Sequence, residues 1–104
     1  MSNTPLTRIV TVRNPQGLHA RPADSLVRLA STFESTIMIG KGGELVDCKS
    51  ILSLLTLGAE QGTELLISAD GGDAESALQA IEGLFDAGFE DPNEKEGAKR
   101  AVDS

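Results

Sequence analysis

The chain has 104 residues, a formal net charge of -7 at pH 7, and three aromatic residues, all of them Phe. This length suits one domain with one modest core. Because phosphate backbones are bound by clustered Lys and Arg, and bases stack on aromatic rings, the composition argues against a nucleic-acid-binding protein.

The N-terminal segment and the single cysteine both favour a cytoplasmic protein. The segment MSNTPLTRIV lacks the basic start and apolar run of a signal peptide. No apolar stretch reaches the roughly 18 residues of a membrane helix, so no membrane partner is expected. Cys48 has no internal disulfide partner, which fits a reducing compartment. Its position at the end of a predicted strand favours a structural cysteine over a reactive thiol.

The first half of the chain predicts a strand, a helix and two further strands. The β-branched residues of 7–13 favour a strand, and NPQG then turns the chain. A helix should follow His19, because apolar residues recur at helical spacing from Ala23 and Pro22 fits a first helical turn. The segments 36–40 and 44–48 predict two strands joined by a KGG hairpin turn.

The second half predicts a helix, a strand and a helix. Residues 49–58 suit a short helix, with Ser50 as its cap and Gly58 at its end. Residues 64–69 favour a strand. DGGD then turns the chain, and Asp73 is the expected N-cap of a helix over 74–85, which has the clearest helical periodicity.

The element order is therefore βαββαβα. Helices at this spacing on an antiparallel sheet predict an α+β fold, a two-layer open-faced sandwich with helices on one face of four strands. We expect a single domain over 1–88. The polar segment 89–104 is expected to be a flexible or partly helical tail, since it lacks an apolar pattern.

The stretch GLHARPA, residues 17–23, holds the only histidine of the chain. His19 directly precedes the predicted helix, whose first backbone N–H groups form an anion site. Arg21 adds a guanidinium that can grip phosphate oxygens at two points. A neutral imidazole is a nucleophile, so His19 could accept a phosphoryl group and hold it there.

The residues alone leave other roles open for His19. On spacing alone, a histidine after a glycine is only a turn residue about as often as it is a functional one. A metal site is disfavoured because no Cys or second His lies nearby. A serine hydrolase is disfavoured because no G-x-S-x-G motif is present.

Two motifs resemble the HPr family, the histidine phosphocarriers of the bacterial phosphoenolpyruvate-dependent sugar phosphotransferase system (PTS). GLHARPA resembles the family's active-site signature, and the segment 49–78 resembles its second signature, around a regulatory serine. The resemblance runs without obvious gaps from about Leu6 to Phe85. The open-faced βαββαβα sandwich of that family agrees with the element order above.

The resemblance implies a phosphoryl carrier and not an enzyme that turns over a substrate. His19 would be phosphorylated at Nδ1, and Arg21 and the amides at the helix start, including that of Ala20, would hold the phosphate. Enzyme I would donate the group from phosphoenolpyruvate, and EIIA proteins would accept it. No metal or other cofactor is implied, and we expect a monomer.

Ser50 matches the serine that HPr kinase/phosphorylase modifies in many members of that family. A phosphate there would add roughly 1.5 to 2 negative charges at a helix start and repel acidic partners. The alternative is that Ser50 serves only as an N-cap.

A docking surface for partners is expected beside His19. The resemblance places it on Ile51, Leu52 and Leu55, with Arg28 supplying positive charge. The short helix cannot bury all its apolar residues, so we expect Leu54 and Leu57 inward and Leu52 and Leu55 outward. On spacing alone, such a leucine stripe is more often core.

Asp24 departs from the family pattern, which has a small uncharged residue there. It could pair with Arg21 and compete with phosphate, or only occupy the surface.

Two alternatives to a sugar-uptake carrier remain on the sequence. One is an HPr-like paralogue in a regulatory, nitrogen-type phosphotransfer chain, which would also use His19. The other is a binding module that acts only through Ser50 and its apolar neighbours. The retained LHAR segment disfavours the second alternative.

Overall fold

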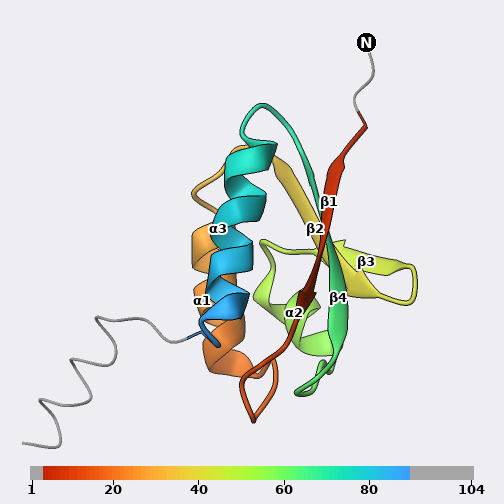
Figure 1. Cartoon of the computed structure of the whole chain (residues 1–104), viewed down its shortest axis with the longest axis vertical. Coiled ribbons are helices and arrows are strands. Elements are labelled where there is room, and N and C mark those ends of the chain that lie inside the picture. Colours follow the sequence, from red (N-terminus) through yellow and green to blue (C-terminus); the bar gives the residue numbers. More distant parts are fainter. Residues whose placement is uncertain (1–3, 90–104) are drawn as a thin grey trace, which may run out of the picture.

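The computed structural model describes residues 4–89, which form one open-faced α/β sandwich (Figure 1). The elements are, in chain order, β1 Leu6–Thr11, α1 Ala20–Ala30, β2 Thr36–Lys41, β3 Glu44–Asp47, α2 Ile51–Thr56, β4 Glu64–Asp70 and α3 Ala74–Asp86. The predicted order βαββαβα and the α+β class are confirmed. Within residues 4–89, no helix is long and apolar enough to cross a membrane.

The four strands form one sheet in the order β1-β4-β2-β3, and every neighbouring pair is antiparallel. Figure 1 shows the sheet nearly edge-on, with α1 and α3 side by side on one of its faces. No helix formed by residues 4–89 covers the opposite face, and Ile9 on it is 58% exposed. The sandwich is therefore open on one side.

Alternation along the strands separates the two faces of the sheet. In β4, Leu65, Ile67 and Ala69 are fully buried, while Leu66 and Ser68 between them are only partly buried. This period of two places alternate side chains against the helices, as expected for an antiparallel sheet with one covered face.

Helix α3 follows its predicted periodicity, and its buried residues are Ala74, Ala77, Leu78, Ile81 and Phe85. The packing continues just past the helix. Phe89 is buried, and its ring meets that of Phe85 edge-on, with centroids 4.8 Å apart. The first residue of the predicted tail thus belongs to the core, because aromatic burial outweighs the polar character of its neighbours. The rest of that predicted tail, 90–104, lies outside the described residues.

The start of α3 corrects one expectation. Asp73 occupies the N-cap position, yet its side chain makes no capping hydrogen bond. Its carboxylate instead accepts hydrogen bonds from the Glu34 N–H at 2.8 Å, the Ser35 N–H at 3.0 Å and the Ser35 hydroxyl at 2.5 Å. Asp73 therefore joins the β4–α3 turn to the α1–β2 turn.

Candidate functional site

The loop that carries His19 is held against the loop that precedes β4. Val12 donates its N–H to the Thr63 carbonyl at 2.9 Å and accepts from the Gly62 N–H at 2.8 Å. Further along, the Leu18 N–H donates to the Ala59 carbonyl at 2.9 Å. These bonds continue the β1–β4 pairing beyond the strand ends and fix the path of the chain up to the histidine.

Gly17 is required by this close approach. Its φ of 76° lies in the left-handed region, and a Cβ there would lie 2.5 Å from the Ala59 carbonyl oxygen. Any other residue would be strained by both the backbone conformation and the contact. The glycine before LHAR thus sets the distance between the His19 loop and its neighbour.

Asn14 braces the same loop from inside. Its side-chain Nδ2 donates to the Gly17 carbonyl, and the Gly17 N–H donates to the Asn14 carbonyl at 3.0 Å. The Oδ1 atom of Asn14 is buried and has no hydrogen-bond partner among residues 4–89. Sequence reasoning did not single out Asn14, although an Asn at the start of a Pro- and Gly-containing turn is a recognised signal for such side-chain bonding.

His19 is the N-cap residue of α1. Its backbone is extended, with φ -89° and ψ -168°, and its carbonyl accepts the first intrahelical bond, from the Ala23 N–H at 2.9 Å. The imidazole makes no capping hydrogen bond, and the residue is exposed. The one histidine of the chain is therefore accessible to another protein at the start of an 11-residue helix.

The surroundings of His19 favour a negative group. Ala20 and Arg21 form the beginning of α1 and are exposed, at the end where the helix dipole is positive. No acidic residue lies in the first turn. Pro22 follows in that turn, as predicted, where its lack of an N–H removes no intrahelical bond. Such a site can stabilise a phosphate carried on the imidazole.

Helix α2 presents the apolar part of the expected docking surface. Leu52 is 72% exposed and Leu55 is 37% exposed, whereas Leu54 is fully buried and Leu57 packs partly against the core. Ile51 is also only partly buried. The predicted inward and outward leucines are thus correct. Because α1 and α2 contact each other, this surface adjoins the helix that begins after His19.

Ser50 is the N-cap of α2, as predicted. Its hydroxyl accepts from the Ser53 N–H at 3.3 Å. The helix ends at Thr56, and Gly58 follows with a φ of 58°, the left-handed conformation expected at a helix end. The predicted helix, 49–58, thus includes the capping residues at both ends. The helix itself, Ile51–Thr56, is shorter.

Two cationic side chains near the site, Lys49 and Arg28, make polar contacts within the protein. The Nζ of Lys49 donates to the Phe33 carbonyl at 2.9 Å. Arg28 pairs through its Nε with the Oδ2 of Asp24 at 2.9 Å, one helical turn earlier. The Asp24 carboxylate, which departs from the family pattern, therefore forms an ion pair with Arg28.

Cys48 lies in the core and not at the surface. Its side chain is fully buried, and this burial, followed by the nearby Asp47 charge, raises the pKa of the thiol to about 12, while Lys49 opposes the shift. Because the thiolate is the reactive form, the buried thiol is inert, in line with the structural role expected. Among the described residues, no three His, Cys, Asp or Glu side chains are grouped to hold a metal ion.

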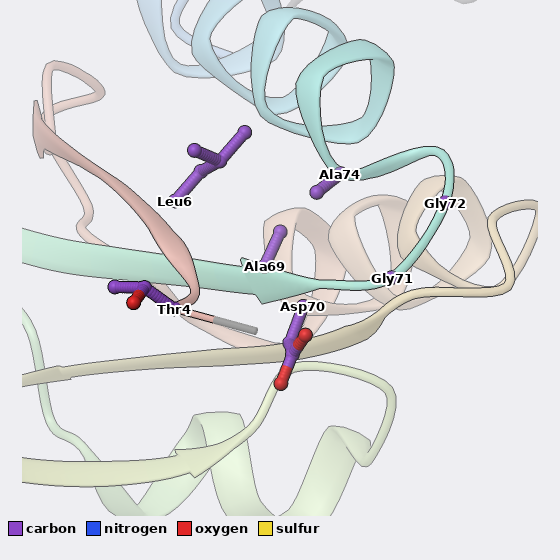
Figure 2. A pocket seen from close by; sticks show the side chains of 7 residues that line it. All are labelled: Thr4, Leu6, Ala69, Asp70, Gly71, Gly72 and Ala74. Carbon is purple, nitrogen blue, oxygen red and sulfur yellow. The ribbon is translucent and has the colours of Figure 1, made fainter. Parts of the chain in front are cut away.

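A pocket of about 440 Å³ lies at the other end of the sheet. It is formed by the start of β1, the end of β4 and the start of α3, with the lining residues Thr4, Leu6, Ala69, Asp70, Gly71, Gly72 and Ala74. Figure 2 shows Leu6 and Ala69 pointing toward the first turn of α3, while Asp70 points to the other side of its strand. The pocket contains neither His19 nor any residue of the docking surface.

Comparison with known proteins gives consistent matches over the described domain. Residues 6–87 match the family described as the PTS HPr component phosphorylation site. The phosphocarrier protein HPr of Treponema pallidum is 41% identical over 86 residues, covering 83% of this chain and 98% of the relative. The phosphocarrier protein NPr of Proteus mirabilis is 39% identical over 85 residues, covering 81% and 94%. A crystal structure of HPr from Thermoanaerobacter tengcongensis superposes with a TM-score of 0.78 at 38% identity, covering 81% of this chain and 94% of that one.

Proposed function

Because the chain belongs to the HPr family of PTS phosphocarrier proteins, we propose that His19 accepts a phosphoryl group from phospho-enzyme I and passes it to EIIA of sugar transport systems. The observation that carries this proposal is the exposed imidazole at the start of α1, which is not used as a helix cap. The protein acts as a carrier: it is covalently phosphorylated and does not turn over a substrate by itself.

The transfer needs only groups that this site supplies. The lone pair of His19 Nδ1 forms a bond to phosphorus while the donor's bond to phosphorus breaks and the donor keeps that electron pair. The same exchange in the opposite sense delivers the group to EIIA. Arg21 and the amides at the start of α1, beginning with Ala20, hold the phosphate oxygens. Positioning and charge stabilisation account for most catalysis of phosphoryl transfer.

Partners dock beside the histidine on a surface formed by Arg28, Ile51, Leu52 and Leu55. The exposure of Leu52 and Leu55 supports this assignment, since exposed apolar side chains grouped on one helix favour a contact with another protein. Arg28 is 79% exposed and can meet a carboxylate of the partner.

Ser50 supplies a regulatory site for HPr kinase/phosphorylase in this proposal. A phosphate on its oxygen would stand at the start of α2, next to the exposed leucines, and repel an acidic partner. Its observed capping bond to Ser53 is the structural alternative, and the variants considered in the Discussion separate the two roles.

A second candidate is a regulatory, nitrogen-type phosphotransfer chain. The likeness to the phosphocarrier protein NPr of Proteus mirabilis favours it. The chemistry at His19 would be the same, and only the enzyme I and EIIA partners would differ.

The test is intact-mass measurement after incubation with phosphoenolpyruvate and a purified enzyme I, with His19→Ala as the control. One acid-labile phosphate on the wild type and none on His19→Ala is the expected result. Sugar-type and nitrogen-type enzymes I, run in parallel, decide between the two chains by their transfer rates. Absence of phosphate with both types would count against the carrier role.

A further inference from the structure

Three charged residues share one exposed stripe of α1. Arg21, Asp24 and Arg28 are spaced i, i+3 and i+7, which places them on the same face of the helix. The Asp24 carboxylate lies between the two arginines along this stripe. Its ion pair with Arg28 has an Nε–Oδ2 distance of 2.9 Å.

This ion pair lies where a partner must dock. The side chains are 79% exposed at Arg28 and 50% exposed at Asp24, so water and a second protein can reach both. Exposed pairs of this kind are weak and open readily. A carboxylate of a partner that takes Arg28 must first displace Asp24, and it then faces the Asp24 charge at close range.

We infer that Asp24 is a specificity-determining residue of the docking surface, acting through Arg28. It lowers the affinity for partners whose docking face is purely acidic. It favours partners that offer a carboxylate to Arg28 together with a cation to Asp24, because the displaced carboxylate is then paired again. This inference rests on the proposed function and adds to it the charge pattern of the accepted partner.

The size of the effect follows from simple electrostatics. When a partner's carboxylate replaces Asp24 on Arg28, the binding free energy gains little, because one ion pair replaces another. The displaced Asp24 carboxylate then repels the acidic partner, and salt screens this repulsion. Removing the Asp24 charge should therefore tighten binding to an acidic docking face about threefold to tenfold at low salt.

The experiment compares wild type, Asp24→Asn, Arg28→Gln and the double variant by calorimetric titration with purified, unphosphorylated enzyme I at low and high salt. Asp70→Asn is the matched control, because it also removes one exposed carboxylate but lies at the last residue of β4, at the opposite end of the sheet. The expected result is tighter binding by Asp24→Asn, a steeper salt dependence, no gain in the Arg28→Gln background, and wild-type affinity for Asp70→Asn.

Three results would overturn the inference. They are equal affinities of wild type and Asp24→Asn, weaker binding by Asp24→Asn, and the same gain in the Arg28→Gln background, which would show that Asp24 does not act through Arg28. Phosphorylation of the wild type is measured in parallel. Phosphate on His19 with unchanged Asp24→Asn affinity rejects only this inference, whereas changed affinity without phosphate rejects only the carrier function. If the proteins do not bind and His19 carries no phosphate, both fail, whereas phosphate on His19 without binding rejects only this inference.

Discussion

Gly17 shows how one residue fixes the position of the loop that carries His19 against the loop before β4. It combines a left-handed backbone with a contact to the Ala59 carbonyl that leaves no room for a Cβ. The adjacent Leu18 N–H donates to that same carbonyl. A change at Gly17 therefore moves the residue before His19 as well as straining the turn.

Replacement Gly17→Ala should lower the free energy of unfolding by about 2 to 4 kcal/mol, because strain and contact add. The control is Gly42→Ala, where φ is 62° and no atom lies near the added Cβ. Gly42→Ala should lower the free energy of unfolding only through backbone strain, by about 1 to 2 kcal/mol. Urea unfolding measures both, and equal losses would contradict the role assigned to the Ala59 contact.

Helix α2 buries one leucine in the core and exposes others that we propose for docking. Six residues are too few to form a stable helix in isolation, so the buried Leu54 must anchor it to the core. The exposed Leu52 has no such task. The same short element thus supplies both a core residue and an exposed leucine of the proposed docking surface.

Leu54→Ala should cost about 2 to 5 kcal/mol of stability, from lost burial and the cavity left behind. Leu52→Ala should change stability by less than about 0.5 kcal/mol but weaken binding to enzyme I. Thermal unfolding and calorimetric titration distinguish the two. A stability loss at Leu52 as large as that at Leu54 would assign both leucines to the core.

Substitutions at Ser50 separate its cap from its proposed regulation. Ser50→Ala loses the bond from the Ser53 N–H and should cost about 0.5 to 2 kcal/mol. Ser50→Asn and Ser50→Asp both keep a capping oxygen, but only Asp adds charge. We expect both to fold like the wild type and only Ser50→Asp to slow phosphoryl transfer from enzyme I. Equal transfer rates for Ser50→Asn and Ser50→Asp would contradict an electrostatic switch at Ser50.

At the scale of the whole molecule, Asp73 ties together two turns that are far apart in the chain. The bond from the Ser35 hydroxyl, followed by that from the Glu34 N–H, lowers the pKa of its carboxyl. Gly71 permits this approach, because a Cβ there would lie 2.5 Å from the Ser35 Oγ. The two turns meet at the end of the sheet away from His19.

The stability of the protein should therefore fall in acid through Asp73. Because its folded pKa is below its unfolded value of about 3.9, the stabilisation is present above that pH and is lost as pH falls through the folded pKa. Urea unfolding between neutral pH and acid should show a shallower decline for Asp73→Asn than for wild type. Ser35→Ala should lie between them, and identical pH profiles would reject the assignment.

Much of the architecture could be predicted from local patterns. The helical period in 74–85 reports which side chains face the core, and the structure agrees at Leu78, Ile81 and Phe85. The outward position of Leu52 followed from the number of leucines on one short helix. The exposed His19 at a helix start followed from its place in GLHARPA.

One contact that sequence reasoning missed joins residues far apart in the chain, and two are local side-chain contacts that a periodic pattern does not report. The sequence predicts that Asp73 caps its own helix, but its carboxylate instead accepts from Ser35, 38 residues away. Asn14 was overlooked, and Phe89 was placed in a tail although its ring partner is Phe85.

The sequence by itself determined the order of elements, a sheet with helices on one face and the histidine at a helix start, because these depend on periodicity, element spacing and turn and cap residues within a few positions. Only the tertiary structure decided that Gly17 meets Ala59, that Asp73 bonds Ser35 and that Asp24 pairs with Arg28. The first two pairs join segments that chain folding brings together. The third is one of several pairs that helical spacing allows, and the structure shows which of them forms.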